Sequence, residues 1–317
     1  MSSNLRFDGQ VAIITGAGRG LGRAYALAIA ERGAKVVVND LGGDVAGIGS
    51  DAGLAQTVAN EIIQLGGEAV SNSSTVVTEE GARSIVEAAL TEWGRVDIVV
   101  NNAGNLEPGG LPDLTTEGLE RHIDIHAIGA FNVTRAAWPA MVEQGYGRVV
   151  VTTSLSSFGA GHMIAYSTAK GATISLGRSL ADAGAGHGIL VNMIAPTAET
   201  RMVTDPEFRE KCGLPPLPDD HEPDPGRGPD PVLPMLFVLA HDSCPSNGET
   251  FIAGLGRYAR IFWAETPGII APGIAAEELI DRWDEISNPA GYVAQALTAD
   301  SVRFREALLA DVLADGS

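Results

Sequence analysis

Short apolar runs alternate along the chain with longer segments in which apolar residues recur every three or four positions. The first run, QVAIITGAG, stops at a glycine cluster, and the segment AYALAIAERG that follows has helical periodicity. A continuous apolar run bounded by turn residues is typical of a buried strand, whereas the 3.6-residue period is typical of an amphipathic helix. The sequence therefore predicts a strand, a glycine turn and a helix at its start.

The same alternation continues through the first two thirds of the chain. It predicts further strands at 34–40, 68–71, 96–101, 147–153 and 189–194, and helices near 54–65, 79–93, 119–141 and 166–183. Nearly continuous apolar strands that alternate with amphipathic helices indicate a parallel sheet covered by helices on both faces. The predicted fold class is therefore α/β, a doubly wound parallel sheet of Rossmann type.

The pattern changes after Pro196, where prolines mix with acidic residues and glycines in LPPLPDDHEPDPGRGPDP. An interdomain linker has similar composition. However, apolar segments resume at PMLFVLAHD and ETFIAG, so we interpret the stretch at about 200–232 as an excursion over the substrate cleft of a single domain, 1–262. Residues 263–317 are predicted to form a helical C-terminal extension, with helices at 275–286 and 301–314.

The amino-acid composition of the chain excludes some classes of binding partner. The net charge is −19, which argues against nucleic acid and against an anionic membrane, since both repel an acidic surface. The longest strongly apolar stretch, VLPMLFVLA, is too short to span a bilayer, and the N-terminus lacks the pattern of a signal peptide. Cys212 and Cys244 fit neither a metal spacing nor a disulfide framework. We therefore expect a cytoplasmic protein without a metal ion.

The glycine turn is a candidate dinucleotide site. TGAGRGLG places Gly16, Gly20 and Gly22 after the first strand and at the start of a helix. Glycine lets the backbone approach a pyrophosphate, and a helix N-terminus offers free N–H groups with partial positive charge. The strand before the turn and the helix after it make the motif much more specific than glycines alone.

Asp40 ends the next strand and favours NAD over NADP. A carboxylate at this position can accept both hydroxyls of an adenosine ribose, and it repels a 2′-phosphate. Two alternatives stay open: Asp40 could cap a turn with Gly42 and Gly43, and Arg19 in the glycine turn could tolerate NADP.

Tyr166 and Lys170 lie one helical turn apart in AYSTAKGA, and Lys170 is one of only three lysines in the chain. Tyrosine is a poor base at neutral pH, but a nearby ammonium group favours the phenolate. Lowering the pKa by ~3 units is worth about 4 kcal/mol. Lysine can also hold ribose hydroxyls, for which a planar guanidinium is less suited. The pair is therefore a candidate for removing an alcohol proton while hydride leaves the carbon.

Hydroxyl side chains that could orient the substrate oxygen gather in VVVTTSLSSFG, at the carboxyl end of a strand, where α/β sheets bind ligands. The residues alone leave the choice open among Thr152, Thr153, Ser154, Ser156 and Ser157.

Four motifs in this order resemble the short-chain dehydrogenase/reductase family over about residues 7–256. They are TGAGRGLG, NNAG at 101–104, YSTAK at 166–170 and VNMIAPTAETRM at 191–202. FNVTRAAWPAM, IAPTAETRM and GLGRYARIFWAETPG carry a narrower resemblance to the (3R)-hydroxyacyl-CoA dehydrogenase units of peroxisomal multifunctional enzymes, also known as type 4 17β-hydroxysteroid dehydrogenases. That subgroup uses NAD to oxidise a 3-hydroxyacyl-CoA to the 3-ketoacyl-CoA.

The resemblance implies roles for individual residues. Tyr166 would be the base, and Lys170 its activator and ribose ligand. Ser154 would orient the substrate oxygen. Thr153 is the second candidate for this role, because it lies thirteen residues before the tyrosine, where the family usually has serine. His126 takes the place of an asparagine that holds a water relaying protons to the lysine. The cofactor would contact Gly16, Arg19, Gly20, Leu21, Gly22, Asp40, Val76, Val77, Asn102, Ala103, Gly104, Tyr166, Lys170, Pro196, Ala198 and Thr200.

Three positions depart from what is usual: Thr153 and His126, as described above, and Val76. Val76 replaces an acidic residue, so backbone N–H groups would have to serve the adenine. His122 and His126 have the spacing of a metal pair, but without a third ligand nearby we favour packing or the family role over zinc.

The leading expectation is oxidation of a 3-hydroxyacyl-CoA in fatty-acyl or steroid side-chain β-oxidation, by a homodimer or homotetramer that pairs through helices 119–141 and 166–183. The alternatives are a dehydrogenase of free hydroxysteroids or other secondary alcohols, and a nucleotide-binding regulator without turnover. The charge of coenzyme A could be offset by basic residues near the excursion and after the last strand, or these residues could simply be solvated loop charges; both interpretations stay open for Arg201, Arg209, Lys211, Arg227, Arg257 and Arg260.

Overall fold

The computed structural model of the chain describes residues 5–200, 204–218, 224–295 and 297–315. Residues 1–260 form one compact unit, and residues 261–317 form a second. Among the described residues, no helix combines the length and the hydropathy that crossing a bilayer requires.

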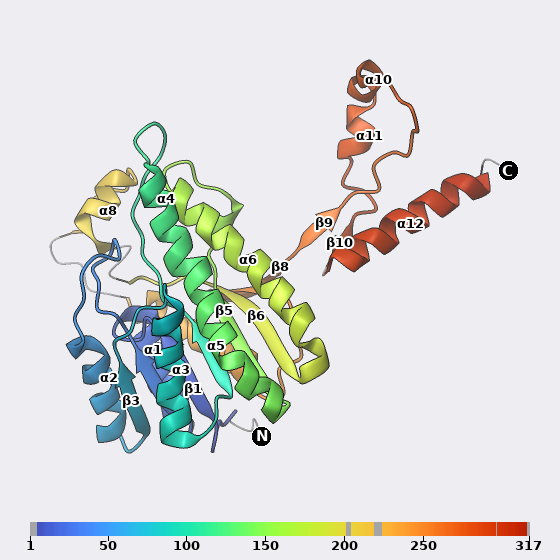
Figure 1. Cartoon of the computed structure of the whole chain (residues 1–317). Helices are drawn as coiled ribbons and strands as arrows, with labels where there is room; N and C mark the ends of the chain where they lie inside the picture. Colours follow the sequence, from blue (N-terminus) through green and yellow to red (C-terminus); the bar gives the residue numbers. More distant parts are fainter. Residues whose placement is uncertain (1–4, 201–203, 219–223, 296, 316–317) are drawn as a thin grey trace. The chain divides into compact units, whose positions relative to one another are not determined.

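The first unit is built on an eight-stranded sheet with the order β3-β2-β1-β4-β5-β6-β7-β8 (Figure 1). Its strands are β1 (Val11–Thr15), β2 (Lys35–Asn39), β3 (Glu68–Asn72), β4 (Ile98–Asn101), β5 (Gly147–Thr152), β6 (Ile189–Pro196), β7 (Thr250–Gly254) and β8 (Arg257–Ile261). Neighbours from β3 to β7 pair in parallel. The chain order reverses at β1, and parallel sheets bind ligands beside the carboxyl ends of the strands at such a point.

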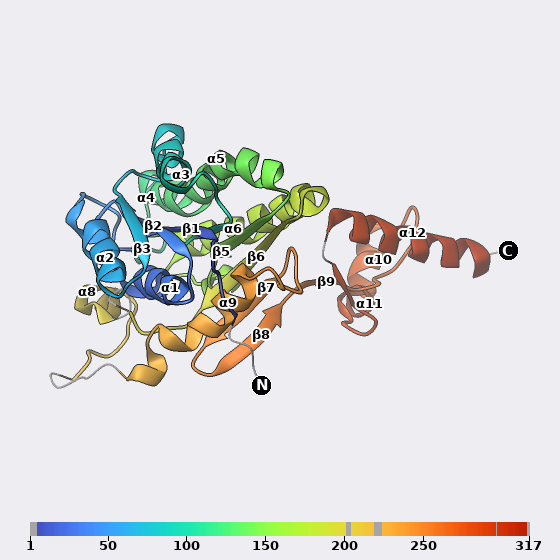
Figure 2. The ribbon, with the colours of Figure 1, turned by 90° about the horizontal axis from the view of Figure 1, so that it is seen from below.

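Helices cover both faces of this sheet (Figure 2). Strand side chains alternate between the faces, as the two-residue period of a strand requires. Ile14 and Val150 face one cluster, which is completed by α1 (Gly20–Glu31), α2 (Gly53–Gln64) and α9 (Leu233–Ala240). Ile13 and Val151 face the other, which is completed by α3 (Glu79–Trp93), α5 (Gly129–Gln144) and α6 (Ile164–Gly184). The predicted doubly wound α/β fold is confirmed.

The helix expected at 119–141 is longer and less regular than the sequence indicated. It consists of α4 (Thr116–Ile123), a π-helical turn η1 (Asp124–Ile128) and then α5. Thr115 caps its start by accepting a hydrogen bond from the N–H of Gly118 at 3.1 Å. Single π turns inside helices are frequent at functional sites, and this one carries His126.

The proline-rich excursion contains a short helix, α8 (Pro206–Lys211), and two 3₁₀ turns, η4 (Pro225–Arg227) and η5 (Asp230–Val232). Strand β8 was not expected from the sequence. It follows β7 through a turn at Leu255 and Gly256, whose φ angles of 51° and 73° are both positive. Two-residue hairpin turns adopt this conformation because it matches the twist of the strands.

The second unit contains two short antiparallel strands and three helices. The strands are β9 (Trp263–Glu265) and β10 (Val293–Gln295), and the helices are α10 (Ala276–Asp281), α11 (Trp283–Ser287) and α12 (Thr298–Asp315). The helix expected at 275–286 is therefore split at Arg282, and the one expected at 301–314 begins earlier.

Candidate active site

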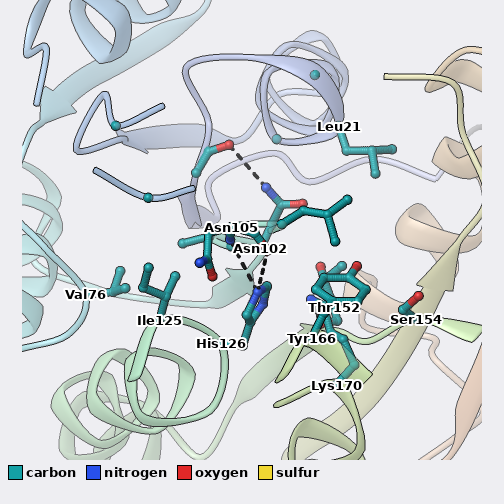
Figure 3. Close-up of a pocket in the computed structure, with 18 of the residues that line it drawn as sticks. Leu21, Val76, Asn102, Asn105, Ile125, His126, Thr152, Ser154, Tyr166 and Lys170 are labelled. Atoms are coloured by element: carbon teal, nitrogen blue, oxygen red, sulfur yellow. Dashed lines mark hydrogen bonds between the residues drawn. The ribbon is translucent and has the colours of Figure 1, made fainter. Parts of the chain in front are cut away.

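A cavity of about 640 Å³ lies at the carboxyl ends of the strands in the first unit. This volume is within the range of about 300–1,000 Å³ that small-molecule sites occupy. Its lining includes every residue that the sequence analysis assigned to catalysis or to the cofactor: Gly16, Arg19, Gly20, Leu21, Gly22, Asp40, Val76, Val77, Asn102, Ala103, Gly104, His126, Ser154, Tyr166, Lys170, Pro196, Ala198 and Thr200. Figure 3 shows Thr152, Ser154, Tyr166 and Lys170 gathered on one side of the cavity and Val76 on the other.

The glycine turn is packed so closely that only glycine fits at its end. A Cβ atom on Gly22 would lie 2.0 Å from the carbonyl oxygen of Gly16. The side-chain amide of Asn102 donates to the carbonyls of Thr15 and Gly16, each at 3.1 Å, and so ties the turn to the end of β4. Helix α1 begins inside the turn at Gly20, and the first N–H groups of a helix have no intrahelical partner. The turn therefore forms a cradle with donors for an anionic group.

Asp40 is held in place by two backbone groups. Its Oδ2 accepts a hydrogen bond from the N–H of Gly18 at 2.7 Å, and its Oδ1 accepts one from the N–H of Gly42 at 2.7 Å. Asp40 thus makes a turn contact with Gly42, which was one of the alternatives, and it also steadies the glycine turn. A carboxylate has about four acceptor sites, so both oxygens retain capacity for further donors.

Hydrogen bonds from the neighbouring helix α5 hold the segment that follows β3. The side-chain amide of Asn132 on α5 donates to the carbonyls of Val76 and Val77, at 3.2 and 2.8 Å. The N–H of Val77 donates to the Thr75 hydroxyl at 3.2 Å. Backbone N–H groups were expected to serve an adenine here, but that of Val77 already has an acceptor.

Tyr166 and Lys170 both come from α6 and line the cavity together. The Lys170 ammonium nitrogen is 5.6 Å from the centroid of the Tyr166 ring, and it donates to the carbonyl of Thr152 at 2.8 Å. Burial lowers the pKa of Lys170 to about 7. Burial also raises the pKa of Tyr166, although a hydrogen bond with Ser154 opposes that rise. Without a cofactor, desolvation of the phenolate outweighs the hydrogen bond with Ser154, and the lowering expected from the ammonium group together with a bound nicotinamide ring stays a prediction.

The structure separates the hydroxyl side chains that the sequence could not rank. The Thr153 hydroxyl donates to the carbonyl of Lys170 at 2.8 Å, on the α6 side of the sheet, and Thr153 is buried. Ser154 and Thr153 both line the cavity, but it is Ser154 that shares a hydrogen bond with Tyr166. Its hydroxyl also accepts from the N–H of Ser156 at 3.1 Å, at the start of the 3₁₀ turn η2 (Leu155–Phe158).

His126 packs edge-on against Tyr166, with ring centroids 5.4 Å apart. Its Nε2 lies 2.9 Å from the carbonyl oxygen of Asn105 (Figure 3). Burial lowers its pKa well below the usual value, and the charge of Lys170 adds to this, so the imidazole is neutral. A Cβ atom on Gly104 would lie 2.4 Å from His126 Cε1, which explains the glycine of NNAG.

His122 is also held by the backbone. Its Nδ1 lies 2.8 Å from the carbonyl oxygen of Gly118, and its Nε2 accepts from the N–H of Glu107 at 3.3 Å. In the described part of the chain, no group of three or more His, Cys, Asp or Glu side chains could hold a metal ion.

Other residues of the lining were not assigned from the sequence. They come mainly from the loop after β2, the segment after β4 and the π turn: Leu41, Gly43, Asp44, Gly47, Asn105, Leu106, Arg121, Asp124, Ile125, Met163 and Phe208. The loop after β2 reaches the segment after β4 through hydrogen bonds from the N–H of Leu106 to Val45 and from the Asn105 side chain to Ala46. Such long-range pairing leaves no periodic signal in the sequence.

The basic residues expected to meet coenzyme A are not in the described lining, where the cations are Arg19, Arg121 and Lys170. Arg227 pairs with Glu199 at 3.6 Å, and Arg260 pairs with Glu249 at 3.3 Å. Arg201 lies outside the described residues.

The burial of Lys170 predicts a pH-dependent stability. The pKa falls from 10.5 for an ordinary lysine to about 7 in the fold. Between these values the unfolded chain binds more protons, so stability rises with pH by up to about 1.4 kcal/mol per pH unit. Lys170→Met removes the ammonium group and should remove this slope between about pH 7 and pH 9. Urea unfolding of the cofactor-free protein would measure it.

The matched control is Lys35→Met, since the Lys35 ammonium pairs with Glu68 at 3.1 Å near the surface. This variant should keep the slope of the parent. A Lys170→Met protein whose stability follows the parent at every pH would show that the buried ammonium is not desolvated.

The chain is similar to known dehydrogenases in sequence. Residues 10–210 match the family model of short chain dehydrogenases. The chain is 41% identical over 291 residues to the peroxisomal multifunctional enzyme type 2 of Mus musculus, an alignment that covers 90% of this chain and 38% of that protein. It is 38% identical over 288 residues to a short-chain type dehydrogenase/reductase of Mycobacterium tuberculosis, covering 89% of this chain and 95% of that protein. The chain therefore spans well under half the length of its multifunctional relative.

Solved structures agree with the fold. Full-length peroxisomal multifunctional enzyme type 2 from Drosophila melanogaster superposes with a TM-score of 0.76 at 28% identity, covering 98% of this chain and 50% of that one. A 7α-hydroxysteroid dehydrogenase complexed with NADH and 7-oxo glycochenodeoxycholic acid superposes with a TM-score of 0.68 at 30% identity, covering 81% of this chain and 97% of that one.

Proposed function

We propose, from the premise that this chain belongs to the short-chain dehydrogenase family, that it oxidises a 3-hydroxyacyl-CoA to the 3-ketoacyl-CoA with NAD as the hydride acceptor. Membership makes the chain an oxidoreductase of this family. The observation that carries the proposal is the joint placement of Ser154, Tyr166 and Lys170 in one cavity with the glycine turn. A binding module without turnover has no need of a phenol, a hydroxyl and an ammonium group in this arrangement.

The residues of the cavity fit a dinucleotide. The turn at Gly16 and Gly22 leaves no room for a Cβ atom, as a cradle for a pyrophosphate requires. Asp40 lines the cavity and retains acceptor capacity for ribose hydroxyls. Its negative charge is unfavourable for a 2′-phosphate, which supports NAD over NADP.

The side chains supply the proton chemistry. The Ser154 hydroxyl donates to the substrate oxygen, and the Tyr166 oxygen accepts the alcohol proton as hydride leaves the carbon. Protonated Lys170 favours the phenolate form of Tyr166. Its ammonium group also binds the ribose hydroxyls, and it donates a hydrogen bond to the carbonyl of Thr152. NAD, when bound, supplies the hydride acceptor and a positive charge beside Tyr166. That charge is needed because burial alone raises the pKa of Tyr166.

His126 fits a supporting role in the same proton chemistry. Its neutral ring lies against Tyr166, and its Nδ1 is buried without a hydrogen-bond partner among the described residues. We therefore assign it to hold a water near Lys170.

The substrate class rests on the narrower resemblance and on the names of the relatives. These include the multifunctional enzyme of Mus musculus and a peroxisomal hydratase-dehydrogenase-epimerase of Saccharomyces cerevisiae, which is 38% identical over 296 residues, 31% of its length. The hydroxysteroid alternative is favoured by the structural likeness to 7α-hydroxysteroid dehydrogenase.

A substrate panel tests the proposal. The formation of reduced cofactor would be followed with (3R)- and (3S)-3-hydroxyacyl-CoA, a free hydroxysteroid and a simple secondary alcohol, each with NAD and with NADP. We expect kcat/KM for the (3R)-acyl-CoA with NAD to exceed the others by about tenfold or more, a difference of about 1.4 kcal/mol. Oxidation of free alcohols alone would contradict the acyl-CoA assignment, and cofactor binding without turnover of any substrate would favour a regulator. The cytoplasmic location and the homodimer or homotetramer stay predictions.

A further inference from the structure

The connection from β2 to α2 is long for a sheet of this kind. Residues 40–52 contain neither a helix nor a strand, whereas a connection between a strand and a helix typically has about 2–6 residues. Connections of about 12 residues or more without secondary structure are uncommon in compact domains, and active-site lids are among them. We call residues 41–51 the strap. Part of the strap lines the cavity: Leu41, Gly43, Asp44 and Gly47.

The strap is closed at its base and compact at its tip. At the base, the N–H of Asp51 donates to the carbonyl of Leu41 at 2.9 Å, and a Cβ atom on Gly42 would lie 2.3 Å from the Asp51 nitrogen. At the tip, the Asp44 side chain accepts from the N–H of Ile48 at 2.9 Å, and the N–H of Asp44 donates to the carbonyl of Ile48 at 2.8 Å. Because the tip is held by its own hydrogen bonds, it can move as one piece about the base.

Two hydrogen bonds, which we call the tie, join the tip of the strap to the segment that follows β4. The carbonyl of Val45 accepts from the N–H of Leu106 at 2.9 Å, and the carbonyl of Ala46 accepts from the Asn105 side-chain amide at 3.0 Å. A Cβ atom on Gly47 would lie 3.2 Å from Asn105 Cβ, so the strap also packs closely against this residue.

The closed strap spans the glycine turn. Strand β1 lies between β2 and β4 in the sheet, and the glycine turn follows β1. The strap follows β2 and its partners in the tie follow β4, so the strap crosses the carboxyl end of β1. Asn105 is the fixed side of the tie, since it is fully buried and its carbonyl oxygen lies 2.9 Å from His126 Nε2 (Figure 3). A dinucleotide bound in the turn would therefore lie under the strap.

We propose that the strap opens and closes over the bound dinucleotide, so that NAD and NADH enter and leave only while the tie is broken. This inference rests on the proposed function, which puts the dinucleotide in the cavity. Both bonds of the tie join groups of the protein itself, so weakening them favours the open strap equally with and without the dinucleotide. The rate constants for association and dissociation then rise together, and their ratio, the Kd, stays the same.

Asn105→Leu tests the proposal because it removes the amide donor and keeps a side chain of similar size. Stopped-flow fluorescence without substrate would give the rate constants for NADH association and dissociation. We expect both to rise about three- to tenfold, as for the loss of one neutral hydrogen bond, while the Kd changes less than about twofold. A direct contact between Asn105 and the cofactor would instead raise the dissociation rate and the Kd together.

Asn192→Leu is the matched control. Asn192 is also fully buried, and its side-chain amide donates to the carbonyl of Ser246 at 2.8 Å, but it is outside the lining. This variant should exchange NADH at the rates of the parent. Unchanged rates in Asn105→Leu, or a rise in dissociation alone, would contradict the strap while the proposed function stands. A parent protein that binds neither NADH nor NADPH would overturn both.

A reversible cross-link tests the opposite change. The Cβ–Cβ distance of 3.2 Å between positions 47 and 105 is close to the range of about 3.5–4.5 Å in disulfides, so Gly47→Cys combined with Asn105→Cys should form one on oxidation. We expect both rate constants to fall at least about tenfold in the oxidised variant and to recover on reduction, because a locked lid blocks exchange.

The reduced form of this double variant is its control, since it carries the same strain at Gly47, whose φ angle is 83°. The parent treated with the same oxidant controls for Cys212 and Cys244. Oxidised protein that has lost both introduced thiols and still exchanges NADH as fast as the reduced form would contradict the strap. If no cross-link forms, the paired rates of Asn105→Leu decide.

Discussion

Tyr166→Phe protein is expected to turn over its alcohol substrate about a thousandfold more slowly than the parent, with the Kd for NADH changed less than about threefold. The variant loses only the phenolic oxygen, which is the proposed proton acceptor, and general base catalysis contributes about 10²–10⁴-fold. The phenyl ring retains its edge-on contact with His126, 5.4 Å away. Steady-state kcat and a separate NADH titration would distinguish a chemical defect from a binding defect.

Tyr146→Phe provides the control for this experiment. Tyr146 precedes β5 at the opposite end of the sheet, where its hydroxyl accepts from the Gln10 side chain at 3.0 Å. Loss of that hydroxyl should leave kcat unchanged. A Tyr166→Phe protein with the kcat of the parent would mean that another group takes the proton, and the role given to Lys170 would then fail as well.

Gly22→Ala should weaken NADH binding by about a hundredfold. The added methyl carbon would lie 2.0 Å from the Gly16 carbonyl oxygen and 2.6 Å from the Asn102 amide nitrogen. Neither can retreat easily, because Asn102 is bonded to the backbone of Thr15 and Gly16. Overpacking of this kind costs about 1–3 kcal/mol, and the turn must shift away from the position in which its donors meet the pyrophosphate.

Gly186→Ala is the matched substitution, since a Cβ atom there would meet no atom within 4 Å among the described residues. Calorimetric titration with NADH and thermal unfolding of both variants would separate a local change at the turn from general destabilisation. Tight NADH binding by Gly22→Ala would show that the turn is not the pyrophosphate site.

The sequence was sufficient to predict strands β1 to β6 and the part of the lining that its motifs supply, because both depend on local patterns. Strands β1 and β2 contain the continuous apolar runs VAII and VVV, and Tyr166 and Lys170 share a helix. Parallel strands bring their carboxyl ends to one edge. The motifs that follow these strands, such as NNAG at 101–104, must therefore meet in space even though they are far apart in sequence.

The electrostatics of the site could not be predicted in the same way. Burial raises the pKa of the Tyr166 phenol and lowers that of the Lys170 ammonium group, and the spacing of the two residues in the sequence does not show how deeply they are buried. Ser154 and Thr153 are adjacent in sequence just after β5, yet their hydroxyl groups have different partners. Which acid pairs with Arg227 or Arg260 depends on how the later segments fold back on the sheet.

The π turn at Asp124–Ile128 has a consequence for how this helix can change over evolution. A π turn is an α-helix with one residue inserted, and each residue advances an α-helix by about 100°. Deleting one residue there would restore an ordinary helix but would rotate α5 against α4, turning Asn132 away from the loop that it holds. The contacts of the side chains on either side therefore prevent the loss of the inserted residue. Insertions and deletions should be tolerated in the loops but not at this turn.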